Sequence, residues 1–166
     1  MKMSTLALLA LLGLGVYWWH DRSSFKNGTY VNPRAGLTVR FPSSWTEQPV
    51  QNGAEFTAGL SGVEFCVVII MPPDKPDAVK YLFSNAINRS VASDKDKKGI
   101  DEFTINGVQG YRVEGNDTSA QVPLKTVAVA VPLKKSSVVM QCVAPPKRFE
   151  DLLSDFNDVI SSISSS

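Results

Sequence analysis

The sequence has little with which to hold a metal ion, since it contains one histidine and two cysteines among 166 residues. A structural zinc site takes four Cys or His ligands, so a Cys/His zinc cluster is excluded. The single imidazole, His20, directly follows an apolar run at the N-terminus. Neither a Ser-His-Asp nor a Cys-His catalytic arrangement is therefore expected. We predict no catalytic, cofactor-binding or metal-binding residues, and no cofactor.

An excess of charge of one sign is also missing. Seventeen Lys and Arg residues oppose sixteen Asp and Glu residues, which gives a net charge of +1. A nucleic-acid-binding domain normally carries a basic patch or a high pI, so no nucleic acid is expected as a partner. The G-x-S-x-G, P-loop and H-E-x-x-H motifs do not occur either. These absences favour a protein that is not an enzyme.

The N-terminus carries a long uncharged run. Lys2 is followed by residues 3–19 without a single charge, and a charged start before an apolar core is typical of a secretory targeting signal. A helix over that run would span about 26 Å, slightly less than the roughly 30 Å hydrocarbon core of a bilayer. Tyr17, Trp18 and Trp19 at its end resemble the aromatic belt of a membrane interface. No A-x-A cleavage site is present, so we predict an uncleaved signal anchor, with a cleaved signal peptide as the alternative.

This signal sets the expected domain organisation and location. Residues 1–20 form the signal anchor or signal peptide, residues 21–28 a polar linker, and residues 29–166 one folded domain. An N-terminal signal normally leads to export of the domain that comes after it. We expect a single-pass protein of the cell (inner) membrane, in contact with the membrane through its N-terminal segment. The C-terminal domain would then be extracytoplasmic, or secreted to the periplasm if the signal is cleaved.

Hydrophobic periodicity predicts a sheet with two helices. Alternating apolar and polar residues favour strands, and Asn106-Gly107 between two of them predicts a type I′ hairpin turn. A further strand is expected at residues 63–71, where from Phe65 onward both alternating sets of residues are apolar, as in a central strand covered on both faces. The remaining strands are expected at 37–41, 54–60, 103–105, 108–113, 126–133 and 138–143.

Amphipathic stripes predict helices from Pro76 to Ile87 and from Pro146 to Ile163, with a frayed end over residues 161–166. Connections of hairpin length imply antiparallel strands. The fold class is therefore α+β: an α/β/α sandwich with one central antiparallel sheet of about six to seven strands and helices packed on both faces.

The two cysteines fall in predicted strands. Cys66 lies in the central strand and Cys142 in the last strand. Both can be small buried thiols, or they can form a disulfide in an oxidising compartment. A bridge needs Cα atoms within about 7 Å, a distance that the sequence does not determine. A disulfide between Cys66 and Cys142 is therefore one of two open alternatives.

Two motifs and the last helix resemble one known family. Residues 36–45, Gly-Leu-Thr-Val-Arg-Phe-Pro-Ser-Ser-Trp, are similar to the opening of the PsbP-like proteins, and residues 104–111, Thr-Ile-Asn-Gly-Val-Gln-Gly-Tyr, to their I-N-G-x-x-G hairpin. The final helix, with Phe149 and Phe156, is also similar, and the resemblance covers residues 29–163. It implies an α/β/α sandwich without a catalytic constellation that binds proteins or small ligands. The exported bacterial branch of the family fits best.

Together these features favour a membrane-tethered, extracytoplasmic accessory domain that binds a protein whose identity is unknown. Its sheet edge or loops would make the contact, for example residues 93–102. The alternative is a periplasmic carrier of a small ligand or lipid, with a cleft between sheet and helix. A hydrolase that uses carboxylates ranks last.

Overall fold

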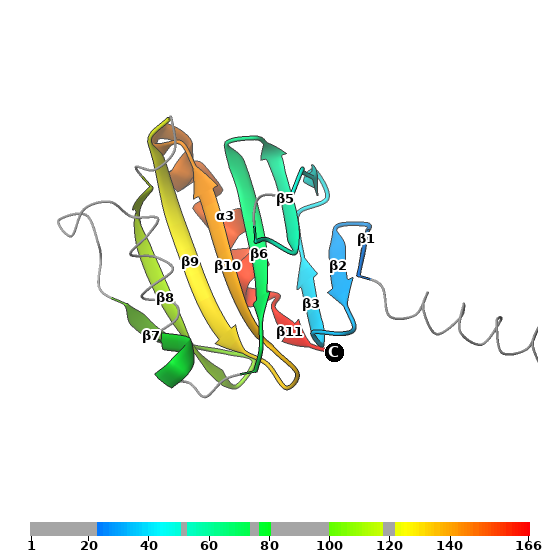
Figure 1. The fold of residues 1–166 in the computed structure, drawn as a ribbon. Coiled ribbons are helices and arrows are strands. Elements are labelled where there is room, and N and C mark those ends of the chain that lie inside the picture. Colours follow the sequence, from blue (N-terminus) through cyan, green and yellow to red (C-terminus); the bar gives the residue numbers. More distant parts are fainter. Residues whose placement is uncertain (1–22, 51–52, 74–76, 81–99, 118–121) are drawn as a thin grey trace, which may run out of the picture.

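The structure is a computed structural model that describes residues 23–50, 53–73, 77–80, 100–117 and 122–166. Its main element is a seven-stranded antiparallel sheet with the strand order β4-β5-β6-β10-β9-β8-β7 (Figure 1). The strands of this sheet are β4 (Thr46–Glu47), β5 (Phe56–Ser61), β6 (Glu64–Met71), β7 (Asp101–Ile105), β8 (Val108–Asp117), β9 (Leu124–Pro132) and β10 (Ser137–Ala144).

Tight turns join neighbouring strands of this sheet. Asn106 and Gly107 connect β7 to β8 with φ angles of 48° and 78°. Both angles lie in the left-handed region that Asn and Gly tolerate, so the predicted hairpin turn is confirmed. β6 lies between β5 and β10 in the interior of the sheet, as its apolar sequence predicted.

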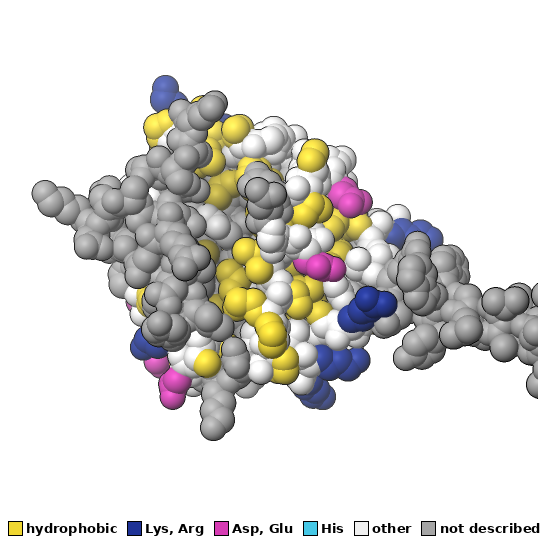
Figure 2. All heavy atoms as spheres, viewed as in Figure 1, with side chains coloured by type: hydrophobic (Ala, Val, Ile, Leu, Met, Phe, Trp, Pro, Cys, Tyr) yellow, Lys and Arg dark blue, Asp and Glu magenta, His cyan; other side chains and the backbone are white. Residues whose placement is uncertain are grey.

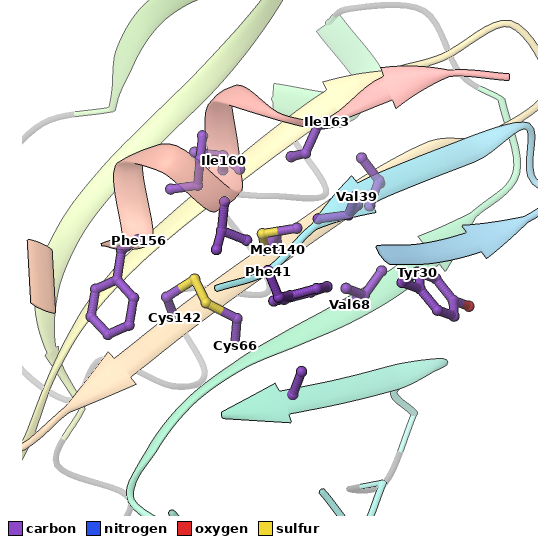
Figure 3. Packing of buried hydrophobic residues seen from close by; sticks show 14 of the residues in the cluster. Tyr30, Val39, Phe41, Cys66, Val68, Met140, Cys142, Phe156, Ile160 and Ile163 are labelled. Atoms are coloured by element: carbon purple, nitrogen blue, oxygen red, sulfur yellow. A yellow bond between two sulfur atoms is a disulfide. The ribbon is translucent and has the colours of Figure 1, made fainter. Parts of the chain in front are cut away.

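One helix, α3 (Pro146–Ser161), covers one face of the sheet (Figures 1 and 3). Pro145 precedes it and Pro146 opens it, a position at which the missing N–H costs nothing. Its buried side chains meet apolar side chains of β6, β9 and β10 in the main core. The buried residues of the helix are Phe149, Leu152, Phe156, Val159 and Ile160.

The opposite face carries the second helical segment. Residues 77–80 are helical, and Val79 is fully buried against Tyr111, Val113 and neighbouring residues of β8 and β9. The rest of the helix predicted from Pro76 to Ile87 lies outside the described residues, apart from these four positions. Helical segments on both faces of an antiparallel sheet confirm the α/β/α sandwich.

A second sheet has four strands in the order β1-β2-β3-β11. It corrects the expected linker at its N-terminal strand and the expected frayed end at its C-terminal strand. Its strands are β1 (Ser24–Lys26), β2 (Thr29–Asn32), β3 (Leu37–Arg40) and β11 (Ser164–Ser165). Residues 24–28, predicted as linker, instead form β1 and the turn that joins it to β2. Asn27 and Gly28 make that turn with φ angles of 50° and 73°.

The C-terminal end is ordered rather than frayed. β11 pairs with β3 at Thr38 and Leu37. The Ser162 hydroxyl accepts a hydrogen bond from the Arg40 amide at 2.8 Å, and Ile163 is buried in the core. Six residues of mostly serine lack periodicity, so tertiary contacts such as the pairing with β3 and the burial of Ile163 fix this segment.

The four-stranded sheet and α3 share a core on the same side of the seven-stranded sheet (Figure 3). Tyr30 stacks on Phe56 with ring centroids 4.2 Å apart. The ring of the buried Trp45 packs edge-on against that of Phe156, with ring centroids 6.0 Å apart. These aromatic contacts join the N-terminal strands to both the sheet and α3.

Within the described residues, we find no helix with the length and apolar character that a bilayer crossing requires. The predicted membrane segment, residues 3–19, lies outside that part of the chain.

Candidate functional site

The face of β6 that points away from α3 exposes apolar surface. Cys66 and Val68 on the α3 side are completely buried, whereas Val67, Ile69 and Met71 on the other side are half-buried. We call these three residues the β6 face. Figure 2 shows apolar side chains gathered on this side of the molecule. Contiguous exposed apolar surface is a mark of binding sites.

The β5–β6 hairpin also exposes apolar side chains. Leu60 and Val63 there are 40% and 39% exposed, among the most exposed large hydrophobic side chains of the described residues. The sequence predicted a strand covered on both faces. On the face away from α3, Ile69 and Met71 pack against the cluster that contains Val79 but remain partly exposed. On the α3 side Cys66 and Val68 are fully enclosed, whereas Ile70 is half-buried.

An apolar cleft of about 430 Å³ lies at one end of the sheet. It is bounded by the β7–β8 turn, the end of β9 and the C-terminal segment. Its apolar lining consists of Ile105, Val108, Val131, Pro132, Leu133 and Ile163. Lys134 and the amide group of Asn106 add polar groups at its edge. A volume of a few hundred Å³ is typical of small-ligand sites.

One side-chain hydrogen bond joins two walls of this cleft. Asn106 Nδ2 donates to the carbonyl oxygen of Ile163 at 2.7 Å. The bond fastens the β7–β8 turn to the segment that comes after α3. The sequence predicted the turn but not the cleft, because the C-terminal segment was expected to be frayed.

A second cleft of about 260 Å³ lies between the other end of the sheet and α3. Its lining combines the apolar side chains of Phe149 and Leu153 with charged side chains that form ion pairs. Lys125 Nζ lies 3.0 Å from Glu150 Oε1 and 5.6 Å from the ring centre of Phe149. Glu114 forms an ion pair with Arg112 at 2.9 Å. Charges that are neutralised within the cleft leave little to recognise a charged ligand.

A buried polar network lies where β2 ends. Asn32 Nδ2 donates to the Tyr30 hydroxyl and to Glu55 Oε1, both at 3.2 Å. The Ala35 amide donates to Asn32 Oδ1 at 3.0 Å. Burial raises the pKa of Tyr30 above its ordinary value, and the negative charge of Glu55 adds to the rise. The network holds the loop after β2 and is consistent with a structural role.

The two cysteines are joined by a disulfide. Cys66 and Cys142 face each other on β6 and β10, with Cα atoms 3.9 Å apart. Both are completely buried on the α3 side of the sheet (Figure 3). Of the two alternatives that the sequence left open, the structure therefore contains the bridge. The pairing of two strands distant in the sequence brings the cysteines together.

The structure describes only part of the predicted contact region. Residues 93–99 of the predicted contact region 93–102, and His20, lie outside the described residues. Asp101 and Glu102 begin β7 with exposed side chains. No group of three or more His, Cys, Asp or Glu side chains that could hold a metal ion is found in the described part of the chain.

Comparison with known proteins identifies the fold. No protein-family model matches the chain, and no curated protein matches its sequence. Among solved structures, the cyanobacterial PsbP of Synechocystis sp. PCC 6803 (CyanoP) is similar with a TM-score of 0.61 and 17% identity, over 83% of this chain and 91% of that one.

Two further structures are similar. LpqN of Mycobacterium tuberculosis, described as involved in cell envelope biogenesis, has a TM-score of 0.51 and 12% identity, over 77% of this chain and 82% of that one. A Bacteroides thetaiotaomicron protein has a TM-score of 0.60 and 11% identity. The similarity covers 86% of this chain and 49% of the Bacteroides chain. At these identities the likeness concerns the fold alone. The chain has a PsbP-like fold, as its two motifs predicted.

Proposed function

We propose that this PsbP-like domain is a membrane-tethered, extracytoplasmic accessory module that binds another protein and has no catalytic chemistry of its own. The observation that carries the proposal is the partly exposed β6 face, formed by Val67, Ile69 and Met71. Burying such a surface against a partner removes apolar area from water, which is the main driving force of most protein association.

Export is supported by the sequence and by the disulfide. Residues 3–19 are uncharged and come directly after Lys2, a pattern typical of secretory targeting. The Cys66–Cys142 bridge lies in the core, and disulfides form and persist mainly in oxidising compartments outside the cytoplasm. The similar LpqN, described as involved in cell envelope biogenesis, is in keeping with such a location.

Topology is tested with the full chain in intact spheroplasts. Added protease should digest residues 29–166, while the same chain in unlysed cells stays protected. Full protection in spheroplasts, with digestion after detergent, would show that the domain is on the cytoplasmic side.

Protein binding is tested with a photo-crosslinking amino acid in place of Val67, in the full chain and in its native membranes. We expect one discrete adduct, and we expect the I69T variant to reduce its yield because a hydroxyl replaces apolar surface in the β6 face. The matched control is V50T, since Val50 is an exposed valine outside this face. Equal yields in the two variants would refute the β6 face as the binding surface.

The apolar cleft favours a second function, that of a carrier for a small apolar ligand. Its volume of about 430 Å³ and its apolar lining suit such a ligand. Native mass spectrometry of protein from its own membranes should show a bound mass, and V108F, which fills the cleft, should abolish it. A spectrum of unliganded protein alone would exclude this function.

A further inference from the structure

The point at which the described chain begins is fixed by strand pairing. Ser24 pairs with Val31, whereas Lys26 pairs with Thr29 next to the β1–β2 turn. The described chain therefore starts beside the end of β2, where the loop of residues 33–36 begins. A tether formed by the preceding residues would reach the domain at this end.

Three segments meet at the same end. The loop of residues 133–136 joins β9 to β10, and Lys135 Nζ donates to the carbonyl oxygen of Pro33 at 3.3 Å. The Ser136 hydroxyl donates to the carbonyl oxygen of Ala35 at 2.8 Å, and the Ser166 amide donates to that of Gly36 at 3.0 Å. We call loops 33–36 and 133–136, together with Ser166, the exit end.

Close packing holds the side chain of Lys135 in place at the exit end. Gly36 has a φ of 63°, and a Cβ atom there would lie 3.2 Å from Cδ of Lys135. The absence of a side chain at Gly36 thus leaves room for the stem of Lys135 to lie across the loop. Ala35 and Ser136 are buried beneath it, so the two loops form one surface.

The exit end is basic, although the chain as a whole is close to neutral. Arg34, Lys134 and Lys135 are all exposed there, and Figure 2 shows Lys and Arg side chains gathered at this end of the molecule. Glu55, hydrogen-bonded to Asn32, is an acidic neighbour among the described residues. The exposed ammonium groups of Lys134 and Lys135 make this surface positive.

We infer that the exit end lies against the membrane and that Lys134 and Lys135 contact the anionic headgroups of its phospholipids. The inference rests on the proposed tether. A tether that enters at the exit end keeps this surface near the bilayer, and basic residues close to an anionic bilayer surface are attracted to it within a Debye length. The occupant is an anionic lipid headgroup, because it is the anion that a tether at this position brings within reach.

The test uses the full chain in nanodiscs of phosphatidylcholine alone or mixed with phosphatidylglycerol. Lysine acetylation is measured residue by residue by mass spectrometry. Lys147 is the internal control, because it is exposed and comes after the far end of β10. In the discs with phosphatidylglycerol we expect Lys134 and Lys135 to react roughly five-fold more slowly, whereas Lys147 keeps its rate.

Matched charge reversals make the test specific. K134E should restore much of the reactivity of Lys135 in the anionic discs, and K147E, which makes the same charge change at the other end, should not. Equal rates in the two kinds of disc, or equal slowing of Lys147, would overturn the inference while leaving the tether intact. A chain that does not enter the discs at all would overturn the tether and the inference together.

Discussion

Cys66 and Cys142 are direct partners across the β6–β10 ladder, although 76 positions separate them in the sequence. Their bridge links β6, from the middle of the chain, to β10, which is the last strand of the large sheet in chain order. It also lies in the same core as Phe156 of α3. The covalent link therefore joins the two halves of the sheet on the side that α3 covers.

The first prediction concerns this link. Closing a loop of this length restricts the unfolded chain, and the chain-entropy relation gives a stabilisation of about 4 kcal/mol. We expect C66A/C142A to lower the free energy of unfolding by about that amount, measured by urea denaturation monitored through tryptophan fluorescence. Part of the loss will come from the removed sulfur atoms, which are buried.

The bond itself is checked by mass. Alkylation of the denatured chain should add two alkyl groups after reduction and none before. Two groups added without a reductant would show that Cys66 and Cys142 are free thiols in the purified protein.

The second prediction compares two glycines of the β5–β6 hairpin. A Cβ atom at Gly59 would collide with the carbonyl oxygen of Glu64 and with Cβ of Phe65, whereas one at Gly62 would meet nothing within 4 Å. We expect G59A to lower the free energy of unfolding by roughly 2 kcal/mol, as overpacking of a core does.

The matched control is G62A, which should leave the urea midpoint nearly unchanged. Both variants add one methyl group to the same hairpin, so their difference isolates the close approach of β5 and β6 at Gly59. Equal midpoints for the two variants would contradict the packing described for this pair of strands.

The third prediction concerns alkaline pH. Burial raises the pKa of Tyr30 above its ordinary value of 10.0, so the folded chain holds this proton more tightly than the unfolded chain does. The stability that it contributes is complete below the unfolded pKa and is lost as the pH rises through the folded pKa. We expect the free energy of unfolding to fall above about pH 10, and to fall less steeply in Y30F.

Urea titrations at several pH values test this expectation. Y30F also loses the hydrogen bond that Asn32 donates to the hydroxyl, which lowers stability by a similar amount at every pH below 10. The slope above pH 10, rather than the absolute stability, is therefore the informative quantity. Identical slopes for the wild-type chain and Y30F would contradict a raised pKa of Tyr30.

The sequence predicted the large sheet well, because its strands are long enough to show periodicity. β6 is eight residues long and β9 nine, and Asn106-Gly107 identifies the turn between β7 and β8 through chemistry that is local. The last helix was equally clear from its apolar stripe and from the two prolines at its start.

The second sheet was missed for a physical reason. β1 has three residues and β11 two, so neither shows a pattern of alternation. Pairing with β2 and β3 defines both strands, and this pairing depends on tertiary contacts such as the hydrogen bond between Ser162 and Arg40. The disulfide, the apolar cleft and the exit end also depend on strands or loops that are far apart in the sequence.

The fourth prediction concerns the ordered C-terminal segment. Ile163 is 1% exposed, and its carbonyl oxygen accepts the hydrogen bond from Asn106. We expect I163A to lower the free energy of unfolding by about 2–4 kcal/mol, because it removes buried methyl groups and leaves a cavity. S165A, two positions further at an exposed site of β11, should change the urea midpoint little. A frayed C-terminus would instead make the two variants equally harmless, so a difference between their midpoints distinguishes the ordered segment from a frayed one.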